Sequence, residues 1–432
     1  MTAHGVPNPA ETAFWNETNL EVELRRVGNI CHGCRLCFNL CPSFRELFRR
    51  IDEKGEAVEN LTRDDFKQVV LLCYDCKLCF PKCPYTPPHN YQLDFPRLMV
   101  RARALWGKRG LRERFLEDPD RLALLGVPMA PLANWVNQLS ITRRLFEKIM
   151  GIHHRAVLPT FARQTFAAWH RRRMRRDGAR AGANGKVVLF YTCLVNYHEP
   201  EVGRAAVQVL EHNDVEVVCP PQRCCGMPYL DTGNLPAAVK RARYNVERLV
   251  PYVRAGYTIV SPGPSCSLML RQEYPHLLSS PEAREVASHT QDLCEYLMKL
   301  NAQGKLRRDW TPLQEGILYH HPCHLQVQNI GRKSWDLLAL ISEKEVGCVT
   351  QCSGHDGTWS MKREYHELSH QIGGKLYSRV QESLSSLVAC DCSLAQKQIT
   401  QGTGKKAVHP ILLVARAYGL GGEGSSGETH SQ

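Results

Sequence analysis

The segments CHGCRLCFNLCP (residues 31–42) and CYDCKLCFPKCP (residues 73–84) decide the N-terminal fold. Each places three cysteines three positions apart and a fourth cysteine four positions later, directly before a proline. The short gaps allow one loop to wrap three thiolates around one face of a metal cluster, while the cysteine before proline ligates a second cluster. Because the full motif occurs twice, the sequence predicts two [4Fe–4S] clusters.

In this pattern each cluster takes three ligands from one motif and its fourth ligand from the other motif. The first cluster is assigned to Cys31, Cys34, Cys37 and Cys83. The second cluster is assigned to Cys73, Cys76, Cys79 and Cys41. The alternative is a pair of zinc sites, but zinc sites rarely combine a tight cysteine triplet with a Cys-Pro pair.

The connection between the two motifs favours an α-helical ferredoxin over the compact β type. Thr62 is a residue type that caps helices, and Asp64 and Asp65 are favourable in a first turn. Residues 66–72 then run helically into the second motif. We therefore expect an α-helical ferredoxin domain over residues 20–96.

The cysteine content and the charge of the chain are unusual. The 432 residues include 19 cysteines and 18 histidines, and the net charge is +12. Between residues 97 and 186, 20 Lys/Arg stand against 6 Asp/Glu, which indicates a local basic block that faces an anionic surface. We see no signal peptide and no run that approaches the ~18 apolar residues needed to span a bilayer. Reduced thiols in the cytoplasm are therefore expected.

The basic block, residues 97–185, is predicted to hold an amphipathic helical segment and to close with a linker. The apolar side chains that recur there at helical spacing are Leu132, Trp135, Val136, Leu139, Phe146, Ile149 and Met150. Arg143, Arg144 and Lys148 are interleaved with them. Such a helix lies in a membrane interface, or it packs on its own protein with arginine stems over apolar surface. No recognition motif supports nucleic acid as a partner.

Residues 186–420 repeat themselves. The predicted strands are 186–192 and 257–261 in the first copy, and 316–322 and 386–389 in the second. The interval between the first two cysteines of the repeat pattern is 31 positions in the first copy and 29 in the second. The interval from there to the last cysteine of the pattern is 42 positions in the first copy and 40 in the second. This shared register indicates a duplication.

Helical stretches at residues 200–212 and 236–254 alternate with the predicted strands. This alternation predicts βαβ units and a mostly parallel sheet. The repeat cysteines then follow the carboxyl ends of strands, where open α/β sheets bind their ligands. They are Cys193, Cys224, Cys225 and Cys266 in the first copy, and Cys323, Cys352 and Cys392 in the second.

The Cys-Cys-Gly sequence at residues 224–226 resembles the cysteine-rich CCG domain of heterodisulfide reductase subunits. In that family a first cysteine is followed by Cys-Cys-Gly and then by Cys-x-x-Cys. The complete motif implies a five-cysteine, non-cubane cluster. Gly263 replaces one of these cysteines in the first copy, and Ser353 and Ala389 replace two in the second.

The number of cysteines that each copy keeps determines what that copy is expected to bind. Four thiolates suffice for an ordinary cluster, so the first copy is predicted to bind a third iron–sulfur cluster. The second copy has three, which His324, His355, Ser353 or Cys390 would supplement. The alternative is that these are buried structural thiols. That is the expectation for the cysteines outside the repeat, which are Cys219, Cys294 and Cys348.

Over roughly residues 25–420, the sequence resembles the iron–sulfur C subunits of anaerobic glycerol-3-phosphate dehydrogenases and their Fe–S oxidoreductase relatives. The resemblance implies an α+β multidomain fold, in which an α-helical dicluster ferredoxin precedes two repeated α/β CCG domains. The CCG domains are expected at residues 186–310 and 311–420, followed by a disordered tail at 421–432. The resemblance also implies a protein that carries electrons from a flavin dehydrogenase to membrane quinone, peripherally on the inner face of the cytoplasmic membrane.

The resulting hypothesis is an oxidoreductase subunit without substrate turnover of its own. It passes electrons from a partner dehydrogenase through two [4Fe–4S] clusters and a CCG-bound cluster to quinone or a protein acceptor. No dinucleotide or P-loop motif occurs in a working context, so flavin and nicotinamide are expected on another chain.

Two other functions stay open from the sequence. One is a heterodisulfide-reductase-like enzyme that reduces a disulfide or another small substrate, and the other is a soluble donor to a peroxide-reducing partner. For quinone reduction, the histidines around Cys323 favour the second copy as the acceptor side. His324 is then the expected catalytic residue, because histidine exchanges protons near neutral pH.

Overall fold

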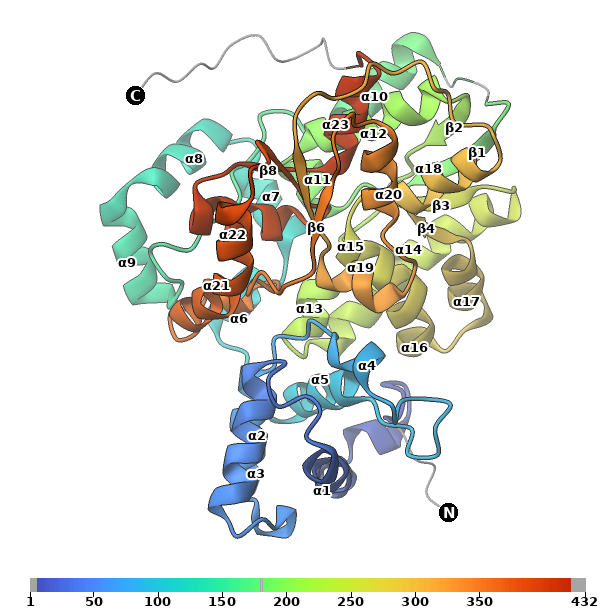
Figure 1. Cartoon of the computed structure of the whole chain (residues 1–432). Helices are drawn as coiled ribbons and strands as arrows, with labels where there is room; N and C mark the ends of the chain where they lie inside the picture. The colour runs from blue at the N-terminus through green and yellow to red at the C-terminus, as the bar shows by residue number, and fades with distance from the viewer. Residues whose placement is uncertain (1–5, 179, 181, 421–432) are drawn as a thin grey trace.

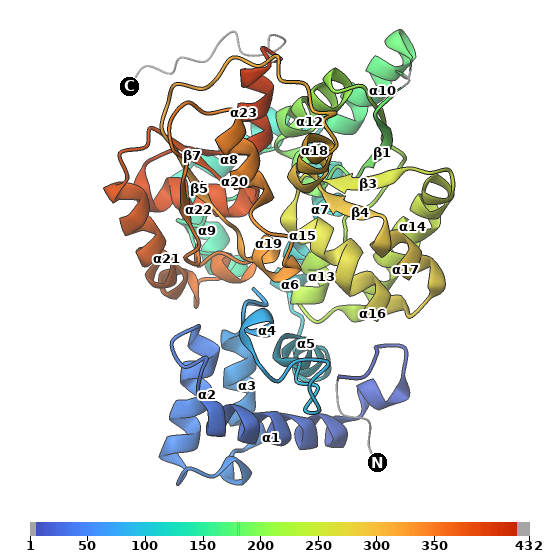
Figure 2. The ribbon, with the colours of Figure 1, turned by 45° about the vertical axis from the view of Figure 1, so that its right-hand side comes forward.

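The computed structural model describes residues 6–178, 180 and 182–420. The tail expected to be disordered, residues 421–432, lies outside the described residues. A helical N-terminal region forms one end of the molecule, and two α/β units lie side by side above it in Figures 1 and 2. The predicted α+β multidomain fold is confirmed.

The N-terminal region is built from helices. Its α-helices are α1 (Glu17–Cys34), α2 (Pro42–Glu53), α3 (Arg63–Leu72), α4 (Cys79–Lys82) and α5 (Phe95–Trp106). The helix start predicted at Thr62 is confirmed, because Thr62 and Asp65 form a reciprocal capping box at the start of α3. Buried Phe44, Phe66 and Leu98 join α2, α3 and α5 in one apolar core.

The two α/β units have the same sheet topology. The first sheet has the order β2-β1-β3-β4 and the second has the order β6-β5-β7-β8. The strands are β1 (Gly185–Leu189), β2 (Val215–Val218), β3 (Thr258–Ser261), β4 (Thr290–Asp292), β5 (Ile317–His320), β6 (Gly347–Val349), β7 (Leu387–Ala389) and β8 (Ala407–Val408). The pairs that these strands form are parallel. The predicted duplication and its parallel sheets are confirmed.

Helices cover the two sheets. In the first repeat they are α11 (Cys193–Tyr197), α12 (Pro200–His212), α13 (Met227–Asp231), α14 (Leu235–Arg254), α15 (Pro264–Leu268), α16 (Tyr274–Leu278), α17 (Pro281–Ser288) and α18 (Leu293–Ala302). In the second they are α19 (Cys323–Gln328), α20 (Lys333–Leu340), α21 (His366–Glu382), α22 (Ser393–Thr403) and α23 (Pro410–Ala417). The predicted helix at 200–212 has the bounds of α12.

The two repeats share one apolar core. Val187 and Val260 of the first sheet belong to the same buried cluster as Tyr319 of the second sheet. Helix α23, at the end of the second repeat, packs against α12 of the first. The apolar side chains of both repeats are therefore removed from water together, which fixes one repeat against the other.

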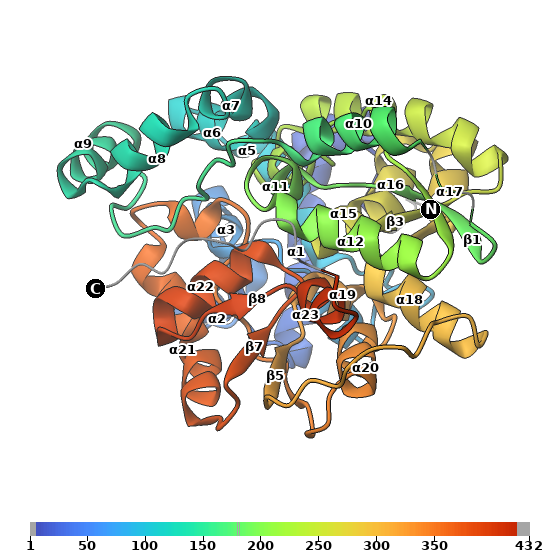
Figure 3. The same cartoon turned by 90° about the horizontal axis from the view of Figure 1, so that it is seen from above.

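The basic middle segment corrects one prediction. Its helices are α6 (Leu111–Leu116), α7 (Pro119–Gly126), α8 (Ala130–Gln138), α9 (Ser140–Met150) and α10 (Phe166–Asp177). The helical spacing predicted from Leu132 to Met150 does not run through one helix, because Leu139 has an extended backbone and separates α8 from α9. Figure 3 shows α8 and α9 at the margin of the molecule.

The position of the Arg143 side chain also differs from the prediction, which places it among the surface cations. Its side chain is buried and donates hydrogen bonds to the carbonyls of His153, His154 and Ala156. Arg144 and Lys148 are exposed. Within the described part of the chain, none of the helices combines the length and the apolar character that crossing a membrane requires.

Candidate functional site

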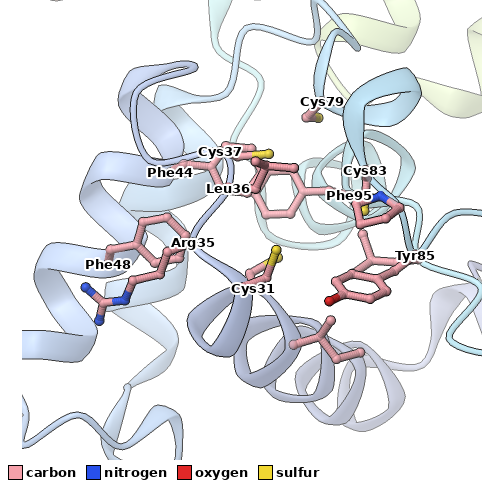
Figure 4. Close-up of a pocket in the computed structure, with 14 residues that line it drawn as sticks. Cys31, Arg35, Leu36, Cys37, Phe44, Phe48, Cys79, Cys83, Tyr85 and Phe95 are labelled. Carbon is pink, nitrogen blue, oxygen red and sulfur yellow. The ribbon is translucent and has the colours of Figure 1, made fainter.

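The first cysteine group surrounds a small pocket at the end of α1. Cys31 and Cys34 come from the last turns of α1, and Cys83 follows α4. Arg35 has a left-handed backbone with φ of 50°, which turns the chain so that Cys37 faces the same pocket. Figure 4 shows Cys31, Cys37 and Cys83 around one space walled by aromatic rings. The structure thus brings together the four residues assigned to the first cluster.

Free thiolates are disfavoured at the cysteine positions of this group. Burial raises the pKa of Cys31, and the neighbouring thiols of Cys37 and Cys83 raise it further. Burial raises the pKa of Cys37 to about 11. Thiolates at these positions therefore need a positive core to stabilise them, as a coordinating metal does. A donor set of four sulfurs suits a [4Fe–4S] cluster.

The second cysteine group lines a separate pocket between α2 and α5. Its members are Cys41, Cys73, Cys76 and Cys79, the four residues assigned to the second cluster. Burial raises the pKa of Cys41 to about 12 and that of Cys73 to about 11. Cluster binding by both groups remains a prediction, and the donor chemistry is the same in each.

A buried ion pair holds the second cysteine loop. Lys77, between two cysteines of the motif, lies 2.9 Å from Glu273 and 3.6 Å from Asp75. Lys77 and Glu273 are both almost fully buried, with 4% and 3% of their surface exposed. Burial alone would raise the pKa of Glu273, but Lys77 and Arg97 hold it well below its usual range. The pair therefore stays charged and ties this loop to the first repeat.

The four cysteines of the first repeat lie together at the carboxyl edge of its sheet. The thiols of Cys193 and Cys224 are close neighbours, and that of Cys225 neighbours those of Cys224 and Cys266. These sulfur contacts lower the pKa of Cys224 and raise those of Cys193 and Cys225. The group therefore offers four sulfur donors that are neighbours in pairs.

The cysteines of the second repeat open into the same cavity as three of the four cysteines of the first repeat, and Cys224 is outside its lining. This cavity measures about 110 Å³. Its cysteine lining is Cys193, Cys225 and Cys266 from the first repeat, and Cys323, Cys352 and Cys392 from the second. The prediction treats the repeats as separate sites, whereas the structure places their cysteines around one space.

The other cysteines of the repeat region lie elsewhere. Cys390 is buried, with its sulfur 3.2 Å from Nδ1 of His320 and the backbone N–H of Cys392 donating to it. Cys294 is buried and lies 3.9 Å from a carboxylate oxygen of Asp391. The cavity lining does not include Cys219, Cys294, Cys348 or Cys390.

His324 is held between three parts of the molecule. Its Nδ1 lies 2.8 Å from the Ser265 hydroxyl of the first repeat, and its Nε2 lies 3.4 Å from the Asp75 carbonyl in the second cysteine loop. Burial lowers the pKa of His324 to about 4. The imidazole is therefore neutral near pH 7, and both of its nitrogens have protein partners.

The second cysteine group adjoins the shared cavity. The Tyr74 hydroxyl lies 3.5 Å from the Cys352 sulfur. Burial raises the pKa of Cys76, and the thiols of Cys323 and Cys352 raise it further, so these sulfurs interact electrostatically. Tyr74 also packs against Trp359 of the second repeat, with ring centroids 5.1 Å apart. The second cysteine pocket thus lies directly against the second repeat.

Several buried polar residues around this junction escape sequence reasoning. Asp75, Asp231 and Asp356 come from three parts of the chain, and burial raises the pKa of each carboxyl. Asp231 and Asp356 line the shared cavity. Lys77 and Tyr74 occupy the variable positions of a cysteine motif, which carry no signal of their own.

Comparison with known proteins identifies both types of domain. Residues 24–106 match the Citrate utilization protein B Fer4-like domain, and residues 187–271 match the CCG cysteine-rich domain. The C subunit of anaerobic glycerol-3-phosphate dehydrogenase from Escherichia coli (strain K12) is 30% identical over 325 residues, which covers 74% of this chain and 81% of the relative.

A second group of relatives matches a shorter part of the chain. Lactate utilization protein A of Bacillus cytotoxicus is 31% identical over 219 residues, covering 48% of this chain and 87% of the relative. The protein of the same name from Bacillus licheniformis is 29% identical over 218 residues, with the same shares covered. The Fer4-like and cysteine-rich domains make this chain an iron–sulfur electron-transfer subunit, and it belongs to the family of the C subunits of anaerobic glycerol-3-phosphate dehydrogenase.

Proposed function

We propose that this chain takes electrons from a flavin-containing dehydrogenase partner and delivers them, through the shared cavity between its repeats, to quinone. The observation that carries the proposal is the contact between the second cysteine group and the cavity, where Tyr74 lies 3.5 Å from the sulfur of Cys352. The name of the Escherichia coli relative supports a dehydrogenase partner. [4Fe–4S] clusters, when bound, supply one-electron transfer.

The residues of the two N-terminal pockets have two roles: the cysteines would bind the clusters, and the aromatic side chains exclude water. Cys31, Cys34, Cys37 and Cys83 would hold one cluster, and Cys41, Cys73, Cys76 and Cys79 would hold the other. Phe44 and Phe95 line both pockets and exclude water from the space between the cysteine groups. Water exclusion and hydrogen bonds to sulfur set the potential of such centres.

The shared cavity supplies the acceptor end of the route. Cys193, Cys224, Cys225 and Cys266 would hold a further cluster, and the three cysteines of the second repeat face it across the cavity. Quinone reduction needs protons as well as electrons. Burial raises the pKa of Asp231 and Asp356 well above the usual range, which favours the protonated form of these two carboxyls beside the cavity.

His324 is proposed as the residue that keeps this acceptor site in its working geometry. It connects Ser265 of the first repeat to the backbone of the second cysteine loop. Because its imidazole is neutral near pH 7 and both of its nitrogens have partners, its contribution is to hold these contacts rather than to carry a charge.

A membrane surface is the proposed location of the quinone. Helices α7, α8 and α9 expose large apolar side chains, and basic Arg144 and Lys148 are exposed beside them on α9. The exposed apolar residues are Leu124, Leu125, Met129, Leu132, Trp135, Val136, Leu139, Ile141, Leu145 and Ile149. An apolar face with neighbouring cations fits the interface of an anionic bilayer.

The crossed ligation of the N-terminal clusters is tested by single cysteine variants of the full chain. Cys41→Ala is expected to damage the cluster of the second group, and Cys83→Ala that of the first, because each thiolate completes the opposite triplet. Iron and sulfide content and the electron paramagnetic resonance of the reduced protein measure this. Cys348→Ala is the matched control and should keep both signals. If Cys41→Ala alters the signal of the first group instead, the assignment is wrong.

The acceptor site is tested by comparing Cys225→Ala with His324→Ala in the complex with its dehydrogenase partner. Cys225→Ala is expected to lose iron, because it removes one of four sulfur donors. His324→Ala is expected to keep most of the iron and to slow quinone reduction. The control is His289→Ala, at an exposed position. Unchanged quinone reduction in His324→Ala would contradict the role of this residue.

Membrane attachment is tested by flotation of the full chain with anionic phospholipid vesicles at low salt. Each exposed Lys or Arg adds up to about 1 kcal/mol of binding free energy, and salt screens this contribution. Trp135→Glu and Arg144→Glu should both reduce flotation. Leu384→Glu, at a fully exposed leucine outside α7–α9, should not. A wild-type chain that stays with the soluble fraction would support the soluble-donor function instead.

A further inference from the structure

Helix α21 opens with the sequence His366-Glu367-Leu368-Ser369-His370. Two histidines four positions apart lie on one face of a helix, and with an adjacent glutamate they form a common zinc-binding pattern. The pattern is short and occurs by chance, so only its structural setting gives it meaning. Here the setting is helical, with the rings of His366 and His370 centred 4.7 Å apart.

A third histidine comes from a distant part of the chain. The ring of His153 stacks on that of His366, with centroids 4.0 Å apart and planes 18° apart. Nε2 of His153 lies 3.9 Å from a carboxylate oxygen of Glu367. Within the described residues, one ligand atom each from His153, His366 and Glu367 lies within 4.8 Å of the other two.

The fold holds these residues in place from two sides. The segment after α9 pairs with the segment before α21, because the N–H of His153 donates to the carbonyl of Met361 and the N–H of Arg363 donates to that of Gly151. Ile152, between them, is fully buried. Buried Arg143 donates to the His153 carbonyl from the other side.

The hydrogen bonds of α21 leave ligand atoms available. Nδ1 of His366 donates to the Ser360 carbonyl at 3.1 Å, which places the ring proton there and leaves Nε2 unprotonated. Most metal-binding histidines are oriented by such a hydrogen bond, made by the ring nitrogen that does not bind the metal. Nε2 of His370 is buried and has no hydrogen-bond partner among the described residues, while its Nδ1 lies 3.4 Å from the Tyr377 hydroxyl.

One hydrogen bond of His153 opposes an ion at its Nε2. Arg155 donates its N–H to Nδ1 of His153 at 3.2 Å, and this contact has to open when Nε2 binds an ion.

A competing trio shares His153. Glu147, His153 and His154 also bring ligand atoms within 4.8 Å. However, Nδ1 of His154 already lies 2.7 Å from Glu147, so these two side chains satisfy each other. Glu367, by contrast, has a side chain that is 70% exposed and a carboxylate that faces His153, so it can move onto an ion.

We propose that His153, His366 and Glu367 bind a divalent transition-metal ion of the zinc type, and that His370, whose ligand atoms lie outside this trio, moves in as the fourth ligand. Three imidazoles and a carboxylate suit zinc, which takes nitrogen and oxygen ligands in tetrahedral sites. Because imidazole nitrogens bind a metal in the plane of the ring, the ring of His153 has to turn out of its stack on His366 for both to bind one ion. The ligand atoms then draw together, since zinc lies about 2.0–2.2 Å from such donors. This site is separate from the cysteine sites, and it braces the loop after α9 against the second repeat.

The test uses the full chain with its iron–sulfur clusters formed under anaerobic conditions. After addition of Zn²⁺ and desalting, zinc and iron are counted together by elemental mass spectrometry. Wild-type protein should retain about one zinc per chain, the occupancy of a single closed site. His366→Ala and Glu367→Gln should each weaken zinc binding by about 10- to 100-fold at unchanged iron content. His154→Ala and the distant His289→Ala should retain the zinc.

Three results would overturn the proposal. The first is a wild-type chain that retains no zinc. The second is zinc that survives in both His366→Ala and Glu367→Gln, because it would then be bound to cysteines. The third is zinc lost in His154→Ala and kept in Glu367→Gln, which would assign the ion to the competing trio. If His366→Ala loses iron through misfolding, the result for Glu367→Gln decides whether the proposal holds. The Glu367 side chain is exposed, so this substitution leaves the core intact.

Discussion

The ion pair between Lys77 and Glu273 is the interaction on which the rest of the structure depends. Burial by itself would lower the pKa of Lys77, but Asp75 and Glu273 raise it, so the ammonium stays charged inside the protein. Removing one partner of such a buried pair costs about 3–5 kcal/mol, because the other charge is left uncompensated. Because Lys77 lies between Cys76 and Cys79, the same contact sets the second cysteine loop against the repeats.

This placement explains why the two halves of the molecule work together. The second cysteine group contacts the shared cavity through Tyr74 and through the His324 hydrogen bond to the Asp75 carbonyl. The first cysteine group lies among the N-terminal helices, at the end of α1. The proposed route therefore runs in one direction, from the first group through the second group to the cavity.

The sequence predicts the parts of this protein whose signal is local. The cysteine spacings predict both N-terminal groups, and the structure brings each group of four together. Regular apolar patterns and the capping residue Thr62 predict α3 and α12. The equal cysteine intervals predict the duplication, because a repeated βαβ unit preserves the distance between strand ends.

The features that sequence misses depend on packing between distant segments. Nothing local marks the break at Leu139, where no glycine or proline interrupts the pattern. Arg143 is expected at the surface, but its side chain is buried because it donates hydrogen bonds to three carbonyls of the following loop. The joining of both repeats' cysteines around one cavity follows from the shared core, which brings the carboxyl ends of the two sheets together.

Anomalous X-ray diffraction at the iron absorption edge tests the proposed electron route most directly. Crystals of the anaerobically prepared full chain would show where iron binds. We predict three iron positions: one among Cys31, Cys34, Cys37 and Cys83, one among Cys41, Cys73, Cys76 and Cys79, and one in the cavity beside Cys225. Iron at the two N-terminal positions with none in the cavity would contradict the route, because it would then have no acceptor end.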